Sequence, residues 1–224
     1  TIIVAPIPNP KNENIGCFGM FDSLVGACSL LRYMPEGAPY AFTEVILFTE
    51  DGWDTWKTIE LDSLLGFPIG TNGGVGGNTF KFFSKEHWGF IHGRTDVGSY
   101  FIFTKDKGKT WQKSNRLLGD RSLYLTSVFF INNKLGWISA SEKNNKGDQR
   151  IDLIFKTTDG GETWELNYRK ENFPIFGLHG IAFKDEMNGL AVGAWGKILR
   201  TTDGGETWVL EYAENHKINM EENP

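Results

Sequence analysis

The sequence predicts an all-β protein made of four similar units, each built from four short strands. The octapeptide TTDGGETW occurs at residues 157–164 and again at 201–208, and looser copies stand at 104–111 (TKDKGKTW) and 49–56 (TEDGWDTW). A second element precedes each copy, in which an apolar residue is followed six positions later by a glycine: Gly26, Gly89, Gly136 and Gly189. No segment shows sustained apolar periodicity of 3.6 residues, so little helix is expected.

The last unit shows the strand pattern most plainly. Strand A is HGIAF (179–183), a polar turn leads to strand B, LAVGA (190–194), and strand C is KILRTT (197–202). The octapeptide then turns the chain into strand D, TWVLEY (207–212). The other units follow the same scheme, so we place the repeats at approximately residues 14–63, 78–116, 124–170 and 178–213.

The chemistry of the octapeptide explains why it recurs. An aspartate in a tight turn accepts hydrogen bonds from backbone N–H groups, the glycine after it tolerates a positive φ, and the tryptophan opens strand D and covers apolar surface. We therefore predict a structural role for eleven residues: Asp51, Trp56, Asp106, Gly108, Trp111, Asp159, Gly161, Trp164, Asp203, Gly205 and Trp208.

The pattern [ST]-x-D-x-G-x-[ST]-W resembles the Asp-box, or BNR repeat, of β-propellers. The first copy departs from it, with Gly52 one place early and Trp53 in the glycine slot. The upstream glycine element, running into KILRTTDGGETW, is similar to the photosystem II stability/assembly factor-like propellers. The resemblance implies an all-β fold, a β-propeller of four-stranded antiparallel blades in a single domain over residues 1–224. Four blades that close a ring, a fifth with strands from the termini, and a piece of a larger ring all remain open.

The loops of such a blade divide between two sides. The A–B and C–D turns emerge on one face of the disc, and the B–C loops and D–A links on the other. The surplus residues of the longer units, 32–42, 141–150 and 64–80, all fall on the second face, and loops on a rigid scaffold are the usual place of binding.

Tyrosine, tryptophan and arginine anchor protein interfaces, so we predict partner binding by residues of this face. The alternative is that these loops merely collect polar and aromatic residues, with Phe173 and Phe176 packing between blades beside Pro174. The predicted partner-binding residues are Arg32, Tyr33, Tyr40, Arg94, Asp96, Arg121, Tyr124, Arg150, Phe173, Phe176, His179 and Trp195.

The net charge limits the classes of partner that the chain can bind, and the two cysteines raise the question of a disulfide. A net charge of -5 disfavours nucleic acid and anionic lipid, and no apolar run approaches the ~20 residues of a membrane span. A hairpin turning at Asp22 and Ser23 would place Cys17 opposite Cys28, as a disulfide or as two buried thiols. Because the chain begins at Thr1 without a methionine, and because the resemblance implies export, we expect a periplasmic or extracellular protein whose signal peptide has been removed.

The sequence supports an enzymatic function less well than it supports a binding function. Asp-boxes also occur in sialidases and other glycoside hydrolases, but a sialidase needs three converging arginines, and the seven arginines here include no R-I-P segment near the start. GKT at 108–110 and GGVGG at 73–77 lack the spacing of phosphate-binding loops. The boxes lack the full calcium-loop pattern, and His87 is expected to be solvated in a turn.

We therefore expect no catalytic residues, no metal and no cofactor. The predicted function is a non-enzymatic scaffold that binds a protein partner, either as an assembly factor or chaperone or as an inhibitor or immunity protein. The alternative is a glycoside hydrolase with an axial carboxylate site, and carbohydrate is a further candidate ligand.

Overall fold

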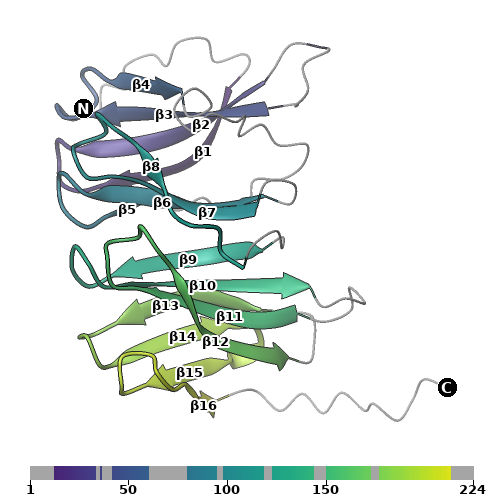
Figure 1. The fold of residues 1–224 in the computed structure, drawn as a ribbon. Helices are drawn as coiled ribbons and strands as arrows, with labels where there is room; N and C mark the ends of the chain where they lie inside the picture. The colour runs from purple at the N-terminus through teal and green to yellow at the C-terminus, as the bar shows by residue number, and fades with distance from the viewer. Residues whose placement is uncertain are drawn as a thin grey trace.

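A computed structural model of the chain describes residues 13–33, 36, 42–60, 80–94, 98–118, 123–143, 150–172 and 177–212. They form four antiparallel sheets of four strands, and within each sheet the strands are neighbours in chain order (Figure 1). The predicted fold class is confirmed: the protein is all-β, with the four-stranded antiparallel blades of a β-propeller. The helical feature of the described residues is one 3-10 turn, η1 (Ala194–Gly196).

We name the sheets blades 1 to 4. Blade 1 contains β1 (Glu13–Met20), β2 (Gly26–Tyr33), β3 (Phe42–Thr49) and β4 (Lys57–Glu60). Blade 2 contains β5 (Phe80–Phe82), β6 (Trp88–Arg94), β7 (Gly98–Thr104) and β8 (Gln112–Lys113). Blade 3 contains β9 (Tyr124–Phe130), β10 (Gly136–Lys143), β11 (Arg150–Thr157) and β12 (Glu165–Asn172). Blade 4 contains β13 (Leu178–Phe183), β14 (Gly189–Gly193), β15 (Ile198–Thr201) and β16 (Val209–Tyr212).

The blades pack in series. Strand β1 contacts β5, β6 contacts β9, and β9 and β10 contact β13. Blades 1 and 4 lie at the two ends of the stack, and no comparable contact joins their strands within the described residues (Figure 1). The four described blades therefore form an open arc and not a closed four-bladed ring. The termini that could add a fifth blade lie outside the described residues.

The A–B and C–D turns share one face, as the sequence predicted. In every blade one backbone N–H of the Asp-box donates to a carbonyl of the A–B turn: Gly52 to Leu24 at 2.9 Å, Lys107 to Glu86 at 3.0 Å, Gly160 to Lys134 at 2.9 Å and Gly204 to Met187 at 2.8 Å. We call this side the Asp-box face and the opposite side the loop face.

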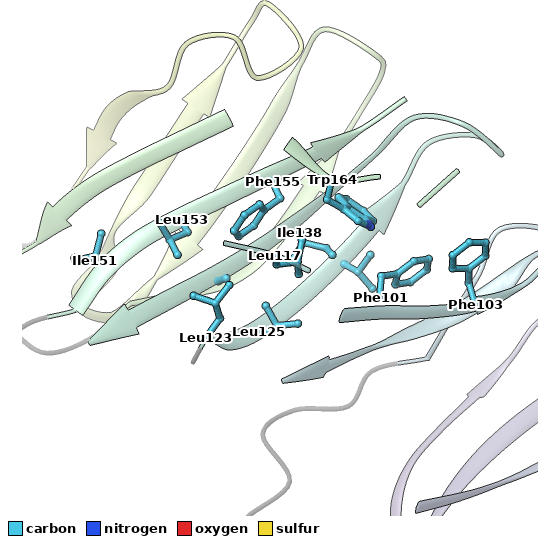
Figure 2. Packing of buried hydrophobic residues seen from close by; sticks show 12 residues of the cluster. Phe101, Phe103, Leu117, Leu123, Leu125, Ile138, Ile151, Leu153, Phe155 and Trp164 are labelled. Carbon is cyan, nitrogen blue, oxygen red and sulfur yellow. The ribbon is translucent and has the colours of Figure 1, made fainter. Parts of the chain in front are cut away.

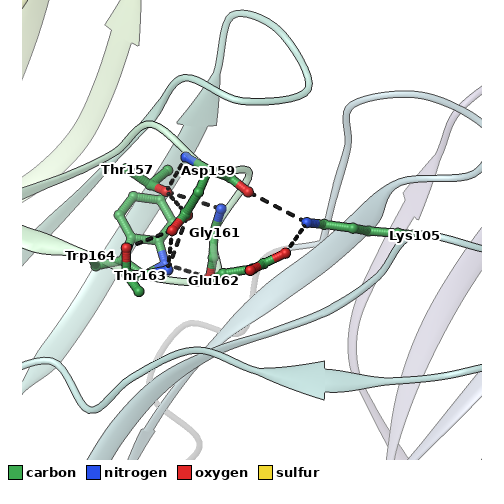
Figure 3. A network of polar contacts seen from close by, with 7 residues as sticks. All are labelled: Lys105, Thr157, Asp159, Gly161, Glu162, Thr163 and Trp164. Carbon is green, nitrogen blue, oxygen red and sulfur yellow. Dashed lines mark hydrogen bonds and ion pairs between the residues drawn. The ribbon is translucent and has the colours of Figure 1, made fainter.

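Each Asp-box is a closed set of hydrogen bonds, and Figure 3 shows the third. The Thr157 hydroxyl donates to Asp159 at 2.8 Å and accepts the N–H of Gly161 at 3.0 Å. The Asp159 carboxylate accepts the N–H of Thr163 at 3.0 Å and its hydroxyl at 2.6 Å. The same threonine–aspartate–threonine contacts recur in the other three boxes. In each box the aspartate thus accepts a backbone N–H, and the first threonine takes part in the same set of hydrogen bonds.

These hydrogen bonds favour the charged carboxylate. Bonds from Thr207 lower the pKa of Asp203 to about 2, and bonds from Thr55 lower the pKa of Asp51. Partial burial acts to raise the pKa of Asp106 and Asp159, but the threonine hydrogen bonds outweigh it, so both pKa values are lowered.

Glycines and tryptophans of the boxes belong to the same turns. Gly108, Gly161 and Gly205 have φ of 76°, 95° and 91°. In the first box Trp53 holds the corresponding position at φ 75°, although it has a Cβ. The indoles of Trp111 and Trp164 donate to the carbonyls of Gly108 and Gly161, which fixes each ring against its own turn.

Apolar side chains fill the junctions between successive blades. In the junction of Figure 2, Phe101 and Phe103 of blade 2 meet Ile138, Phe155 and Trp164 of blade 3, and all five are at most 3% exposed. Burying a side chain of this size stabilises a fold by roughly 1.5–3 kcal/mol. The junctions thus hold the strands rigid beneath the loop face.

His87 is buried, so the expectation that it is solvated was wrong. Its exposed fraction is 4%, and its ring lies against Phe83 with centroids 4.8 Å apart. Burial and the nearby charge of Lys105 lower its pKa to about 4, so the imidazole is neutral near pH 7.

One predicted register was wrong by one residue. A bulge between Ile15 and Cys17 places Phe18, and not Cys17, opposite Cys28, which removes the geometric reason for a bridge. The side chain of Cys17 lies outside the described part of the structure, whereas the buried Cys28 thiol donates to the carbonyl of Ser29 at 3.5 Å.

Blade 2 differs from the other blades by one residue in its register. Gly26, Gly136 and Gly189 each pair with the first threonine of their own box, but Trp88, and not Gly89, pairs with Thr104. Trp88 thereby becomes a core residue that stacks on Phe48, with ring centroids 5.0 Å apart.

Candidate binding face

The predicted partner-binding residues whose backbone is described all stand where strands meet the loop face. Arg32 and Tyr33 end β2, Arg94 ends β6, Tyr124 begins β9, Arg150 begins β11, His179 follows the start of β13 and Trp195 lies between β14 and β15. The side chains of Tyr33 and Arg94 are not described, and Tyr40, Asp96, Arg121, Phe173 and Phe176 lie outside the described residues. Arg32 makes an ion pair with Glu60 at 2.9 Å on blade 1.

Tyr124 and Arg150 are brought together at blade 3. Tyr124 of β9 is opposite Ser141 of β10. Arg150 is the first residue of β11, which pairs with β10 on its other side. The Arg150 guanidinium lies 3.7 Å from the centre of the Tyr124 ring, and its Nη1 donates to the Ser141 hydroxyl at 3.4 Å. Tyr124 is 41% exposed. A stacked guanidinium is oriented by the ring and presents its N–H edge to a ligand, so the pair is a pre-organised contact point.

An ion pair ties this point to blade 4. Asp152 is directly opposite Ser141 and fully buried, and Lys197 of blade 4 donates to it at 2.7 Å. Burial and the charge of Asp152 raise the pKa of the neighbouring Tyr168 to about 12, so its phenol stays protonated. We name Tyr124, Ser141, Arg150, Asp152 and Lys197 the blade 3–4 cluster.

The backbone after β14 is shaped to hold Lys197 there. Trp195 has a positive φ of 63° within η1, and the N–H of Gly193 donates to the carbonyl of Lys197 at 3.0 Å. A Cβ on Gly177 would lie 2.5 Å from the Cβ of Ser141, so the backbone just before β13 passes close to the cluster. Trp195 precedes Lys197 by two residues in the chain, whereas His179 is exposed on β13.

A second acidic residue, Glu142, lies near the end of β10, but its side chain faces away from the cluster. Glu142 pairs with Ile151, one position from the Ser141–Asp152 pair, and successive residues of a strand point to opposite sides of the sheet. Glu142 is 4% exposed and makes an ion pair with Arg169 at 3.1 Å. The two acids therefore do not converge on one point.

The sequence indicated Tyr124, Arg150 and Trp195 but missed Ser141, Asp152 and Lys197. The partners Asp152 and Lys197 are 45 residues apart and lie in different repeats, so no local pattern connects them. Within the described residues, no group of three histidine, cysteine, aspartate or glutamate side chains could hold a metal ion. The part of the chain that the structure describes also has no helix long and apolar enough to cross a membrane.

Comparison with known proteins agrees with the geometry of the turns. A family model, BNR/Asp-box repeat, matches residues 155–166, the third box and its flanks. Residues 155–166 are therefore an Asp-box repeat. None of the curated proteins matches it.

Comparison with solved structures finds similar chains at low sequence identity. The GH74 enzyme of Niastella koreensis is 17% identical with a TM-score of 0.50, over 82% of this chain and 28% of that one. A protein of unknown function from Dyadobacter fermentans is 15% identical with a TM-score of 0.52, over 87% of this chain and 62% of that one. YCF48 from Cyanidioschyzon merolae is 12% identical with a TM-score of 0.46, over 91% of this chain and 86% of that one. The chain thus spans less than two thirds of the first two proteins, and these likenesses concern the fold alone.

Proposed function

We propose that this Asp-box protein is a non-enzymatic scaffold that binds a protein partner through its loop face. The observation that carries the proposal is the exposed Tyr124–Arg150 pair, whose guanidinium is held 3.7 Å from the ring centre. Tyrosine and arginine are enriched among the residues that dominate binding energy, and a pair whose geometry is already set loses little entropy on binding.

The difference in structure between the Asp-box face and the loop face supports the same proposal. On the Asp-box face the side chains of the turns are occupied by the turns themselves, as the contacts among Thr157, Asp159 and Thr163 show. Long connections of the sequence, residues 61–79 and 144–149, start and end at strand ends on the loop face, and loops on a rigid scaffold are the usual place of binding.

Carbohydrate cleavage is the alternative, and the geometry of blade 3 disfavours it there. A glycosidase needs two carboxyl groups roughly 5–10 Å apart on either side of one bond. Glu142 and Asp152 point to opposite sides of their sheet, and each makes an ion pair with a basic side chain. The role of assembly factor or chaperone and that of inhibitor or immunity protein both remain within the proposal, as does an exported location.

Site-specific photo-crosslinking tests the proposal. A photoreactive phenylalanine analogue replaces Tyr124 in one variant and Met187, which is 52% exposed on the Asp-box face, in a matched control. In extract of the native host we expect a defined protein adduct from position 124 and none from 187, and Arg150→Ala should reduce the yield of that adduct at least tenfold. Equal adducts from both positions, or an adduct insensitive to Arg150→Ala, would show that the loop face is not the binding surface.

A further inference from the structure

The first Asp-box has a side chain at a position where the other boxes have glycine. A Cβ on Gly161 would lie 2.6 Å from the ring of Phe101 in blade 2, and a Cβ on Gly205 would lie 3.0 Å from the indole nitrogen of Trp137 in blade 3. Each of these glycines thus makes room for the preceding blade. Within the described residues no blade precedes blade 1, and the side chain of Trp53 occupies the corresponding position at φ 75°.

The first strand of blade 1 carries a matching exception. Phe130 and Phe183 each pair with the glycine that begins the next strand, and each places its ring against that glycine. In blade 1 the residue is Met20, which pairs with Gly26, and a Cβ on Gly26 would clash with the Met20 sulfur. A methionine and a tryptophan thus stand in blade 1 where blades 3 and 4 have a phenylalanine and a glycine.

Met20 and Trp53 are in direct contact, and the sulfur is close to solvent. The Trp53 indole Nε1 donates to the Met20 sulfur at 3.3 Å, and the backbone N–H of Trp53 donates to the Thr49 hydroxyl at 3.0 Å. A bulky residue at positive φ is strained and persists only where its surroundings hold it, so the thioether helps to hold the first box. Met20 is 40% exposed, whereas Phe183 at the same position of blade 4 is 7% exposed.

We propose that Met20 is a reversible oxidation site whose sulfoxide displaces the Trp53 ring from the first Asp-box. The reagent is a hydroperoxide, with hydrogen peroxide as the simplest case. The sulfur lone pair forms an S–O bond while the O–O bond breaks, so the sulfur loses two electrons and the peroxide gains them. The second peroxide oxygen takes up the proton and leaves as water. Methionine sulfoxide reductases restore the thioether.

The added oxygen changes the contact between Met20 and Trp53. It converts an apolar side chain with a weakly accepting sulfur into a polar one. Gly26 on one side of the sulfur is fixed by its ladder pairing with Thr49, so the indole on the other side has to move. Trp53 then loses a contact that offsets its backbone strain, and the folded state becomes less stable.

Peroxide treatment of the full chain tests the proposal. Peptide mass spectrometry follows the oxidation of Met20 and of Met187, which is 52% exposed in the A–B turn of blade 4. Proton–nitrogen NMR follows the indole N–H signal of Trp53, which is identified by its loss in Trp53→Gly. We expect oxidation of Met20 to move that signal and to lower the thermal midpoint by at least about 3 °C, and a sulfoxide reductase to reverse both changes.

Three variants separate the effect of Met20 from other oxidations. Met20→Leu should abolish the fall in the midpoint, and because this variant keeps both cysteines it also controls for thiol oxidation. Met187→Leu should leave the fall unchanged. In Trp53→Gly, which has the glycine of the other boxes, oxidation of Met20 should lower the midpoint by less than about 1 °C.

Three results would overturn the proposal. Met20 could stay unoxidised while Met187 is converted. The midpoint could fall equally in the wild type and in Trp53→Gly, so that Trp53 plays no part. The fall could also persist in Met20→Leu, which would place the sensitive group elsewhere. Because Met20 is a residue of blade 1, these outcomes do not depend on crosslinking at Tyr124 of blade 3.

Discussion

Removing one buried hydroxyl should show how far the Asp-box holds the fold. Thr157 is 2% exposed, and its Oγ1 donates to Asp159 at 2.8 Å and accepts the N–H of Gly161 at 3.0 Å. Thr157→Val keeps the β-branched shape but removes both bonds and the longer one, at 3.4 Å, that the hydroxyl accepts from the N–H of Asp159. It leaves the N–H of the buried Gly161 without its acceptor.

The expected loss follows from these contacts. An unsatisfied buried N–H costs about 1–3 kcal/mol, and a hydrogen bond to a carboxylate contributes about 1.5–3 kcal/mol. The added buried methyl group offsets about 1 kcal/mol. We therefore expect Thr157→Val to destabilise the protein by about 3 kcal/mol, which lowers the midpoint of a domain of this size by roughly 10 °C.

Thr163→Val supplies the comparison within the same box. Thr163 is exposed, and its hydroxyl donates to Asp159 at 2.6 Å, while its backbone N–H bond to the carboxylate survives the change. Such an exposed bond should be worth less than about 1 kcal/mol. The assay is thermal unfolding followed by tryptophan fluorescence. If Thr157→Val costs no more than Thr163→Val, the buried threonine does not hold the turn and our account of the box is wrong.

Three further predictions concern other buried groups. The pKa of His87 is lowered to about 4, so the unfolded chain binds more protons than the folded one below pH ~6.5. Stability should therefore fall as the pH drops from ~6.5 to about 4, and His87→Gln should flatten the midpoint over that window; parallel profiles of the two proteins would contradict it. Lys197→Met leaves the charge of Asp152 buried without its lysine and should cost about 3 kcal/mol in urea unfolding, most of it recovered by adding Asp152→Ser, and failure of that recovery would argue against the ion pair. Thiol titration in denaturant without reductant should count two thiols, Cys17 and Cys28, and a count of zero would restore the bridge.

The turns could be predicted from the sequence because each is self-contained. Asp159 finds its partners two positions before and four after itself, so an eight-residue pattern already contains the whole hydrogen-bonded unit. Four such units in order also predicted the strands and the face on which the turns lie. The hydrogen-bonding capacity of residues within one octapeptide was therefore enough to predict each turn.

The failures share a different cause. The bulge in β1, which places Phe18 opposite Cys28, depends on how two strands pack against each other, and an alternation of residue types does not record this. The burial of His87 and the pairing of Asp152 with Lys197 depend on contacts between blades. Whether four blades close a ring is also decided by contacts between blades, because the octapeptide is the same in either arrangement.

The turn-to-turn hydrogen bonds from Gly52, Lys107, Gly160 and Gly204 all lie on the Asp-box face, so the contacts that fix the turns are concentrated on one side of the molecule. Mutations on the opposite rim can then change what is recognised at little cost to folding. Such a chain is suited to loop grafting: residues 144–149 could be exchanged for a foreign recognition sequence while the β10–β11 ladder keeps the register of its two ends.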